Sequence, residues 1–159
     1  MKIMSTLIIN RSDVAALIRF DPLVCALKKA FIDHSKKCSI VGQRFFSNLP
    51  GPGDMMLLAP GLSPDIPADS VKAHAKFPDQ NPGIRGLLLL NDLQTGALLA
   101  VMDSTYLTAV RTGLSAAIAT HTLARKNAKT VAIVGAGVQG RSQLRYLSTL
   151  RAIEHVSVY

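Results

Sequence analysis

A chain of 159 residues with 48% hydrophobic residues is long enough to bury a core, and none of its apolar runs approaches the roughly 20 residues of a membrane span. The net charge of +8 comes from scattered cations without a run of five, which does not favour nucleic-acid binding. The cysteines show neither metal-ligand spacing nor a disulfide framework, so we expect no metal site. The N-terminus lacks the apolar core of a signal peptide, and we expect a cytoplasmic protein that does not bind membranes.

The first predicted element is a helix over residues 23–37. Asp21 is a suitable N-cap, and Pro22 is favoured at the first helical position. Apolar residues recur at helical spacing along this segment. Cys25 is expected to be a small buried side chain of this helix.

From residue 39 to residue 102 the pattern changes to short β-type runs separated by turn residues. Gly, Pro, Asn and Asp gather between the runs and favour turn conformations. Residues 91–96 predict the connection of a hairpin. The predicted strands cover residues 39–46, 55–58, 71–77, 84–90 and 97–102.

Asp103, Ser104 and Thr105 then predict the cap of a helix that reaches about Arg125. We expect Asp103 to act as this cap rather than as a catalytic base. A short polar link leads from the helix into an apolar β-type run that begins at Val131.

A complete G-x-G-x-x-G follows this run, formed by Gly135, Gly137 and Gly140. In such a motif the first glycine permits a tight turn and the second lets the backbone approach a diphosphate. The third allows close packing of helix on strand. A strand before the motif and a helix after it favour a dinucleotide site over a chance glycine-rich turn.

An acidic residue that holds the cofactor ribose usually lies about 20 residues beyond the first glycine, at the end of the next strand. The chain stops on that strand, at residues 155–159. Because the sequence begins with Met1, we expect a true N-terminus and a missing C-terminal half.

Two further segments and the glycine motif carry a family resemblance: Leu98-Leu-Ala-Val-Met-Asp103, Leu107-Thr-Ala-Val-Arg-Thr-Gly113 and Val134-Gly-Ala-Gly-Val-Gln139. With Val71-Lys72, they resemble the ornithine cyclodeaminase/mu-crystallin family. The resemblance implies an α/β fold in which an α+β substrate-binding and dimerisation domain, residues 1–125, precedes the first β-α-β portion of a Rossmann-type domain, residues 126–159.

The resemblance also implies a homodimer, NAD or NADP as cofactor, and a small amino or cyclic imino acid as substrate. Members of the family are normally about twice as long as this chain. The part that would follow Tyr159 contains the rest of the cofactor site and a catalytic Asp.

Arg44 lies in an apolar strand-like run, where an unpaired cation would be unfavourable. A guanidinium group binds both oxygens of a carboxylate, and the resemblance places a substrate-binding arginine here. The alternative is a surface residue on a polar strand face.

Lys72 matches the substrate-binding lysine of the family, and a desolvated lysine beside another cation can also relay a proton as a catalytic group. Lys72, His74 and Lys76 alternate, so they share one face of a strand. For His74 and Lys76 a structural role is favoured.

The resemblance places Arg111 near both the substrate carboxylate and the cofactor, and the hydroxyl of Thr112 could reach the same groups. The predicted cofactor-binding residues are Arg111, Thr112, Gly135, Gly137, Val138, Gln139 and Gly140.

Leu57 departs from the family pattern, because true ornithine cyclodeaminases carry a glutamate there for the substrate amine. Leucine cannot accept a hydrogen bond from an ammonium group. We therefore favour a ketimine or pyrroline-carboxylate reductase, or an amino-acid dehydrogenase. An ornithine cyclodeaminase (ornithine to proline plus ammonia), a non-catalytic mu-crystallin-like binding protein and an inactive remnant remain alternatives.

Overall fold

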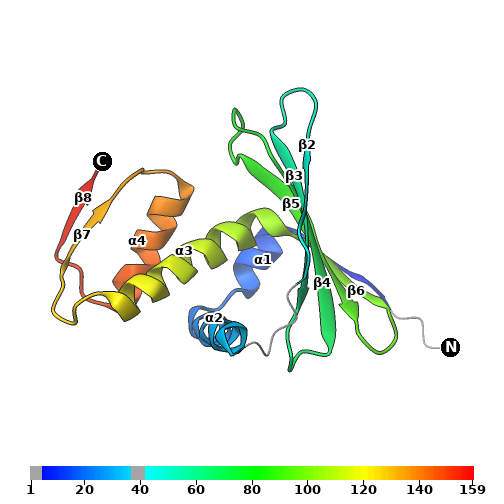
Figure 1. Cartoon of the computed structure of the whole chain (residues 1–159), viewed down its shortest axis with the longest axis horizontal. Coiled ribbons are helices and arrows are strands. Elements are labelled where there is room, and N and C mark those ends of the chain that lie inside the picture. The colour runs from blue at the N-terminus through cyan, green and yellow to red at the C-terminus, as the bar shows by residue number, and fades with distance from the viewer. Residues whose placement is uncertain (1–4, 37–41) are drawn as a thin grey trace. The chain divides into compact units, whose positions relative to one another are not determined.

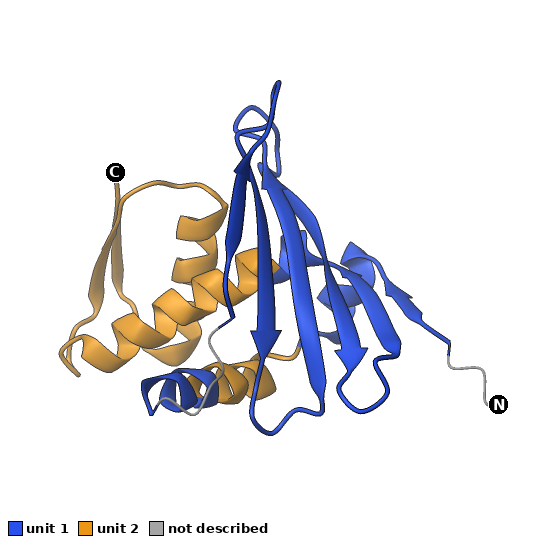
Figure 2. Ribbon diagram, turned by 45° about the vertical axis from the view of Figure 1, so that its right-hand side comes forward, with its two compact units in different colours: residues 1–18, 29–107 blue, residues 19–28, 108–159 orange. Residues whose placement is uncertain are grey.

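The computed structural model describes residues 5–36 and 42–159. The chain forms two compact units (Figure 2). Unit 1 contains Met1–Ile18 and Lys29–Leu107, and unit 2 contains Arg19–Lys28 and Thr108–Tyr159. The predicted α/β class is confirmed. The units divide the chain within two helices, after Lys28 and after Leu107, whereas the domain boundary was predicted near residue 125.

Unit 1 is built on a mixed sheet with the strand order β1-β6-β5-β4-β3-β2 (Figure 1). Neighbouring strands are antiparallel except β1 and β6, which are parallel. A predicted strand overlaps each of these strands except the three-residue β1, although the one over residues 39–46 shares only Phe45 and Phe46 with β2. The strands are β1 (Leu7–Ile9), β2 (Phe45–Asn48), β3 (Met55–Leu62), β4 (Ala68–Lys76), β5 (Ile84–Asp92) and β6 (Leu98–Asp103).

The predicted hairpin between β5 and β6 is confirmed. The Asp92 N–H donates to the Ala97 carbonyl at 2.9 Å, and Gly96 adopts a φ of +70°. The Asp92 carboxylate accepts from the hydroxyl and the N–H of Thr95, and these bonds lower its pKa. The turn therefore fixes the register of the two strands.

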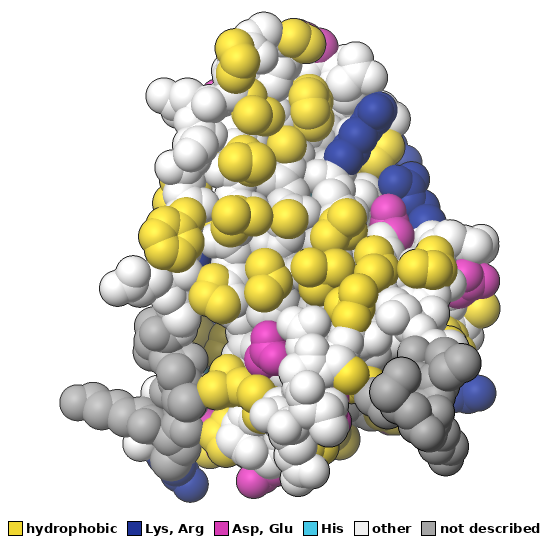
Figure 3. Space-filling view, turned by 90° about the vertical axis from the view of Figure 1, so that its right-hand side faces the viewer, with side chains coloured by type: hydrophobic (Ala, Val, Ile, Leu, Met, Phe, Trp, Pro, Cys, Tyr) yellow, Lys and Arg dark blue, Asp and Glu magenta, His cyan; other side chains and the backbone are white. Residues whose placement is uncertain are grey.

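One face of this sheet is apolar and largely exposed. Strand pairing places Leu58, Ala73 and Leu87 in one row across β3, β4 and β5. Phe45 and Leu87 are 60% and 40% exposed. Figure 3 shows hydrophobic side chains gathered over the sheet. We call this the apolar sheet face; its large side chains are Ile8, Phe45, Met56, Leu58, Val71, Leu87, Leu89 and Val101.

The helix predicted from residue 23 is α2 (Phe20–Ser35), and its predicted start is wrong. The Leu23 N–H donates to the Arg19 carbonyl, so Asp21 lies inside the first turn, where its charge suits the helix dipole. Cys25 is exposed rather than buried.

A short helix that the sequence did not reveal, α1 (Arg11–Leu17), begins with a capping box between Asn10 and Asp13.

The helix predicted after Asp103 is α3 (Ser104–Leu123). The Asp103 carboxylate accepts from the Tyr106 N–H at 3.1 Å, which confirms its predicted role as a cap. None of the helices in residues 5–36 and 42–159 is long and apolar enough to cross a membrane.

Unit 2 contains a parallel β-α-β unit made of β7 (Thr130–Ile133), α4 (Val138–Leu150) and β8 (His155–Val158). The core of this unit is formed by Val24, Leu114 and Ile118, with partly buried apolar residues of α2 and α4 around it. The rings of Phe20 and Tyr146 stack with centroids 5.9 Å apart.

Candidate functional site

The glycine-rich turn lies directly between the carboxyl end of β7 and the start of α4, as predicted. Gly135 has a φ of +93°, in the left-handed region that favours glycine, and its N–H donates to the Tyr159 carbonyl at 2.8 Å. The turn is therefore bonded to the end of β8.

Gly137 and Gly140 face different surroundings. A Cβ at Gly140 would lie 2.1 Å from the Gly135 carbonyl oxygen, so only glycine allows α4 to pack this closely on the turn. At Gly137, in contrast, no described atom outside its immediate neighbours lies within 4 Å of the position of a Cβ. The backbone of Gly137 is thus accessible to a ligand.

The N-terminus of α4 is suited to an anion. Gly137 is the N-cap, and no side chain in the described part of the protein caps α4. The N–H groups at the start of a helix carry partial positive charge and bind phosphate groups. Val138, Gln139 and Gly140 form this first turn.

Arg141 is a candidate site residue that the sequence reasoning missed. Its Nε donates to the Ala136 carbonyl at 2.8 Å, which holds an exposed guanidinium group against the glycine turn. Its position directly after Gly140 could have indicated a role beside the glycine turn. It was counted instead among the scattered cations of the chain.

A hollow of about 270 Å³ lies beside β7 and α4 and reaches Gln139 and Gly140. Its walls also include Leu144 and Leu147 of α4 and Thr120 of α3. The space next to the glycine turn is therefore partly apolar.

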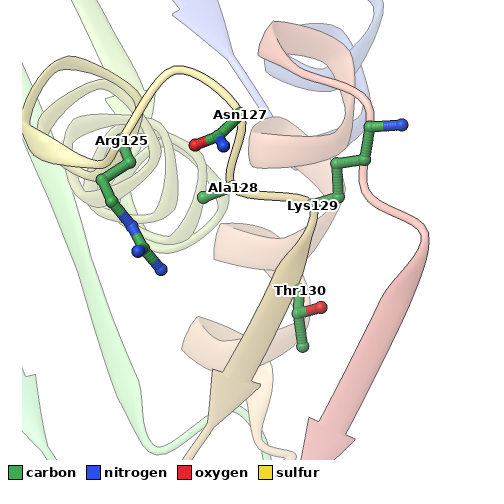
Figure 4. A pocket seen from close by; sticks show the side chains of 5 residues that line it. All are labelled: Arg125, Asn127, Ala128, Lys129 and Thr130. Atoms are coloured by element: carbon green, nitrogen blue, oxygen red, sulfur yellow. The ribbon is translucent and has the colours of Figure 1, made fainter.

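A second hollow, lined by Arg125, Asn127, Ala128, Lys129 and Thr130, lies at the amino end of β7 (Figure 4). Ligands of open α/β sheets bind at the carboxyl ends of the strands. In addition, the Lys129 ammonium points away from Arg125 in this view and pairs with Glu154. We therefore place the candidate nucleotide site at the glycine turn.

Arg111 and Thr112 lie on α3, directly before a close crossing with α4. A Cβ at Gly113 would lie 2.5 Å from the Ser142 Cβ, so the two helices touch at a glycine. Arg111 is exposed and Thr112 is half-buried. Both residues thus belong to unit 2, as does the glycine turn.

Lys72 lies on β4, half-buried, and pairs with Ala59 of β3 and Leu88 of β5. The register places His74 and Lys76 on the same side of the sheet, as predicted; we call this side the Lys72 face. The Lys76 ammonium lies 2.7 Å from the Asp54 carboxylate, which gives Lys76 a structural partner.

Leu57 also lies on the Lys72 face, because it pairs with His74. In the neighbouring strand β5, Gly86 pairs with His74, and a Cβ at Gly86 would lie 2.5 Å from the His74 Cβ. Glycine at this position leaves the space that His74 fills.

Arg44 is exposed and directly precedes β2. The predicted strand over residues 39–46 was wrong for residues 42–44, which are irregular, and its residues 39–41 lie outside the described part of the chain. Arg44 therefore lies just before a strand rather than within an apolar one. Its guanidinium group is exposed, so it is not a cation buried among apolar residues.

A six-stranded mixed sheet followed by a parallel β-α-β unit with a glycine turn defines an α/β protein that contains the beginning of a Rossmann-type fold. Residues 5–159 match the model of the ornithine cyclodeaminase/mu-crystallin family. The chain belongs to this family.

Two relatives are a dehydrogenase and a reductase by name. The chain is 32% identical over 157 residues to an alanine dehydrogenase of Archaeoglobus fulgidus, covering 98% of this chain and 48% of that protein. It is 29% identical to a Delta(1)-pyrroline-2-carboxylate reductase of Bacillus cereus, covering 96% and 48%. The chain thus spans about half the length of these relatives.

A solved structure also matches this chain over about half of its own length. The Delta(1)-pyrroline-2-carboxylate reductase of Thermococcus litoralis, in complex with NADH and L-proline, matches 97% of this chain and 49% of its own length, with 34% identity and a TM-score of 0.88.

The glycine geometry predicts different effects on stability at two positions of the turn. Gly140→Ala should lower the free energy of unfolding by about 2 kcal/mol, because its methyl group overlaps the Gly135 carbonyl. Gly137→Ala should change it by less than about 1 kcal/mol, since its methyl group enters open space. Urea unfolding measures both values, and equal losses would contradict this geometry.

Proposed function

We propose that the chain provides the substrate-binding part and the diphosphate-binding turn of an NAD(P)-dependent oxidoreductase that acts on an amino or cyclic imino acid. The observation that carries this proposal is the accessible Gly137 between β7 and the uncapped N-terminus of α4, within the described residues. The dehydrogenase and reductase relatives support the reaction class.

The glycine turn would hold the diphosphate of the cofactor. Amide groups of Val138, Gln139 and Gly140 would donate to its oxygens, and the open backbone at Gly137 would let it approach. Arg141 would add a positive charge beside it. The bound nicotinamide would supply or accept the hydride, and Arg111 and Thr112 are proposed to contact the cofactor as well.

Cationic side chains would orient the substrate carboxylate. Lys72 lies on β4 and pairs with Ala59 of β3, and Arg44 directly precedes Phe45, which pairs with Leu58, the neighbour of Ala59. We propose that Arg44, Lys72 and Arg111 bind the carboxylate, and that Lys72 also relays a proton to or from the reacting group.

Leu57 supports the reductase or dehydrogenase class over the cyclodeaminases. It lies on the Lys72 face, where it cannot accept a hydrogen bond from a substrate ammonium group. A cyclodeaminase is the second candidate, since part of the chain is 38% identical to an L-lysine cyclodeaminase of Streptomyces rapamycinicus. A non-catalytic binding protein would bind the cofactor without turning over a substrate.

We further propose that two copies associate through the apolar sheet face. Its exposed side chains include Ile8, Phe45, Met56, Leu58 and Leu87. Contiguous apolar surface of this kind is typical of a protein interface. A solved archaeal alanine dehydrogenase that is 31% identical, with a TM-score of 0.87, is a dimer with bound NAD.

Titration with NADH, followed by its fluorescence, tests the proposed cofactor site. The purified chain should enhance NADH fluorescence, and Gly137→Ala should weaken binding about tenfold because its methyl group occupies the space of the diphosphate. Ser148→Ala, on an exposed position late in α4, is the matched control and should bind normally. An unsubstituted chain that leaves NADH and NADPH fluorescence unchanged would refute the proposed function.

The carboxylate site is tested by adding L-proline or pyrroline-2-carboxylate to the NADH-bound chain. Arg44→Ala and Lys72→Ala should each weaken binding of the acid about tenfold or more, as expected when a charged hydrogen bond is lost. Lys76→Ala should not, because the partner of Lys76 is Asp54. Equal affinities for the Lys72 and Lys76 variants would remove Lys72 from the site.

Sedimentation velocity tests the proposed dimer. Leu87→Lys places a charge in the middle of the apolar sheet face and should convert the dimer into monomers. Leu93→Lys is the control, because Leu93 is 49% exposed but lies in the turn after β5 rather than on that face. A monomeric unsubstituted chain, or a dimeric Leu87 variant, would contradict the interface.

A further inference from the structure

The crossing of α3 and α4 depends on a buried glycine. A Cβ at Gly113 would lie 2.5 Å from the Ser142 Cβ, 3.0 Å from the Ser142 carbonyl carbon and 3.1 Å from the Gln143 nitrogen. Any larger residue at Gly113 would therefore have to displace the backbone of α4, since rotating a side chain cannot move these atoms.

A second glycine contact lies on the other side of the same helix. Successive residues of a helix are separated by about 100°, so Gly140 and Ser142 point to nearly opposite sides of α4. At Gly140 the neighbour is the Gly135 carbonyl, which a Cβ would approach to 2.1 Å. The beginning of α4 is thus held between the glycine turn and α3.

We propose that Gly113 is a positioning residue of the diphosphate site. It touches neither the cofactor nor the substrate. By allowing α3 to lie against Ser142, it sets the position of the α4 N-terminus, whose amide groups bind the diphosphate in the proposed function on which this inference rests. Arg111 and Thr112 directly precede Gly113, so a displaced crossing also moves these side chains relative to the turn.

Gly113→Ala is the test, and the measured quantity is the Kd for NADH. Alanine raises the intrinsic helix propensity of α3, so a change in Tm alone does not distinguish a positioning role from a structural one. We expect the folded variant to bind NADH about tenfold more weakly, the loss that corresponds to one hydrogen bond to a charged group. Circular dichroism confirms that the compared proteins are folded.

Ser142→Gly provides the matched control and the rescue. Alone, it removes the atom opposite Gly113 and should leave the Kd unchanged. Combined with Gly113→Ala, it removes the closest overlap and should restore most of the affinity. If Gly113→Ala does not fold, Ser142→Val carries the test, because it adds bulk to the same crossing from α4 and should weaken NADH binding similarly.

The outcomes separate this inference from the proposed function. An unsubstituted chain that does not bind NADH refutes the proposed function and this inference with it. If the unsubstituted chain binds NADH and the folded Gly113→Ala variant binds it equally well, this inference alone is wrong. The same holds if the loss of affinity persists unchanged in the double variant.

Discussion

The close approach of α4 to the turn after β7 is the constraint on which the candidate site depends. The Gly135 carbonyl oxygen occupies the space that a side chain at position 140 would need. This packing requires the left-handed backbone of Gly135 and aligns the start of α4 with the carboxyl end of β7. The helix N-terminus then presents its amide groups at the turn. The candidate anion site is therefore formed by backbone packing and does not depend on the excess of cationic side chains in the sequence.

The proposed substrate-binding part depends instead on the two-residue period of a β-strand. Along β4, Val71 and Ala73 belong to the side that carries the apolar sheet face, while Lys72 and His74 belong to the opposite side. One strand thus contributes both to a surface suited to a second subunit and to a polar surface suited to a carboxylate. On that polar side, the Lys76 ammonium is bonded to the Asp54 carboxylate.

Local sequence patterns predicted the local geometry of this fold well. The hairpin turn, the Asp103 cap and the strand-turn-helix at Gly135 all depend on residues close in sequence, and all are present. Helix α1 was missed although its Asn10–Asp13 capping box is local, whereas other missed features depend on distant residues. The β1 strand is defined by pairing with β6, and α2 extends back to Phe20, whose ring stacks on Tyr146. The close contact at Gly113 was not predicted either, since Ser142 lies on another helix.

The proposed substrate class follows from the cost of leaving a polar group unpaired. A diamino acid carries a side-chain ammonium group that needs an acceptor when it leaves water, and burying it without one is strongly unfavourable. Leu57 lies on the Lys72 face, in the position where the cyclodeaminase pattern has a glutamate, and offers no acceptor. A simple amino acid or a cyclic imine has no second ammonium group, so it would avoid this cost while its carboxylate would still meet the proposed cations. The same leucine that weakens the case for a cyclodeaminase is therefore compatible with the reductase and dehydrogenase reactions.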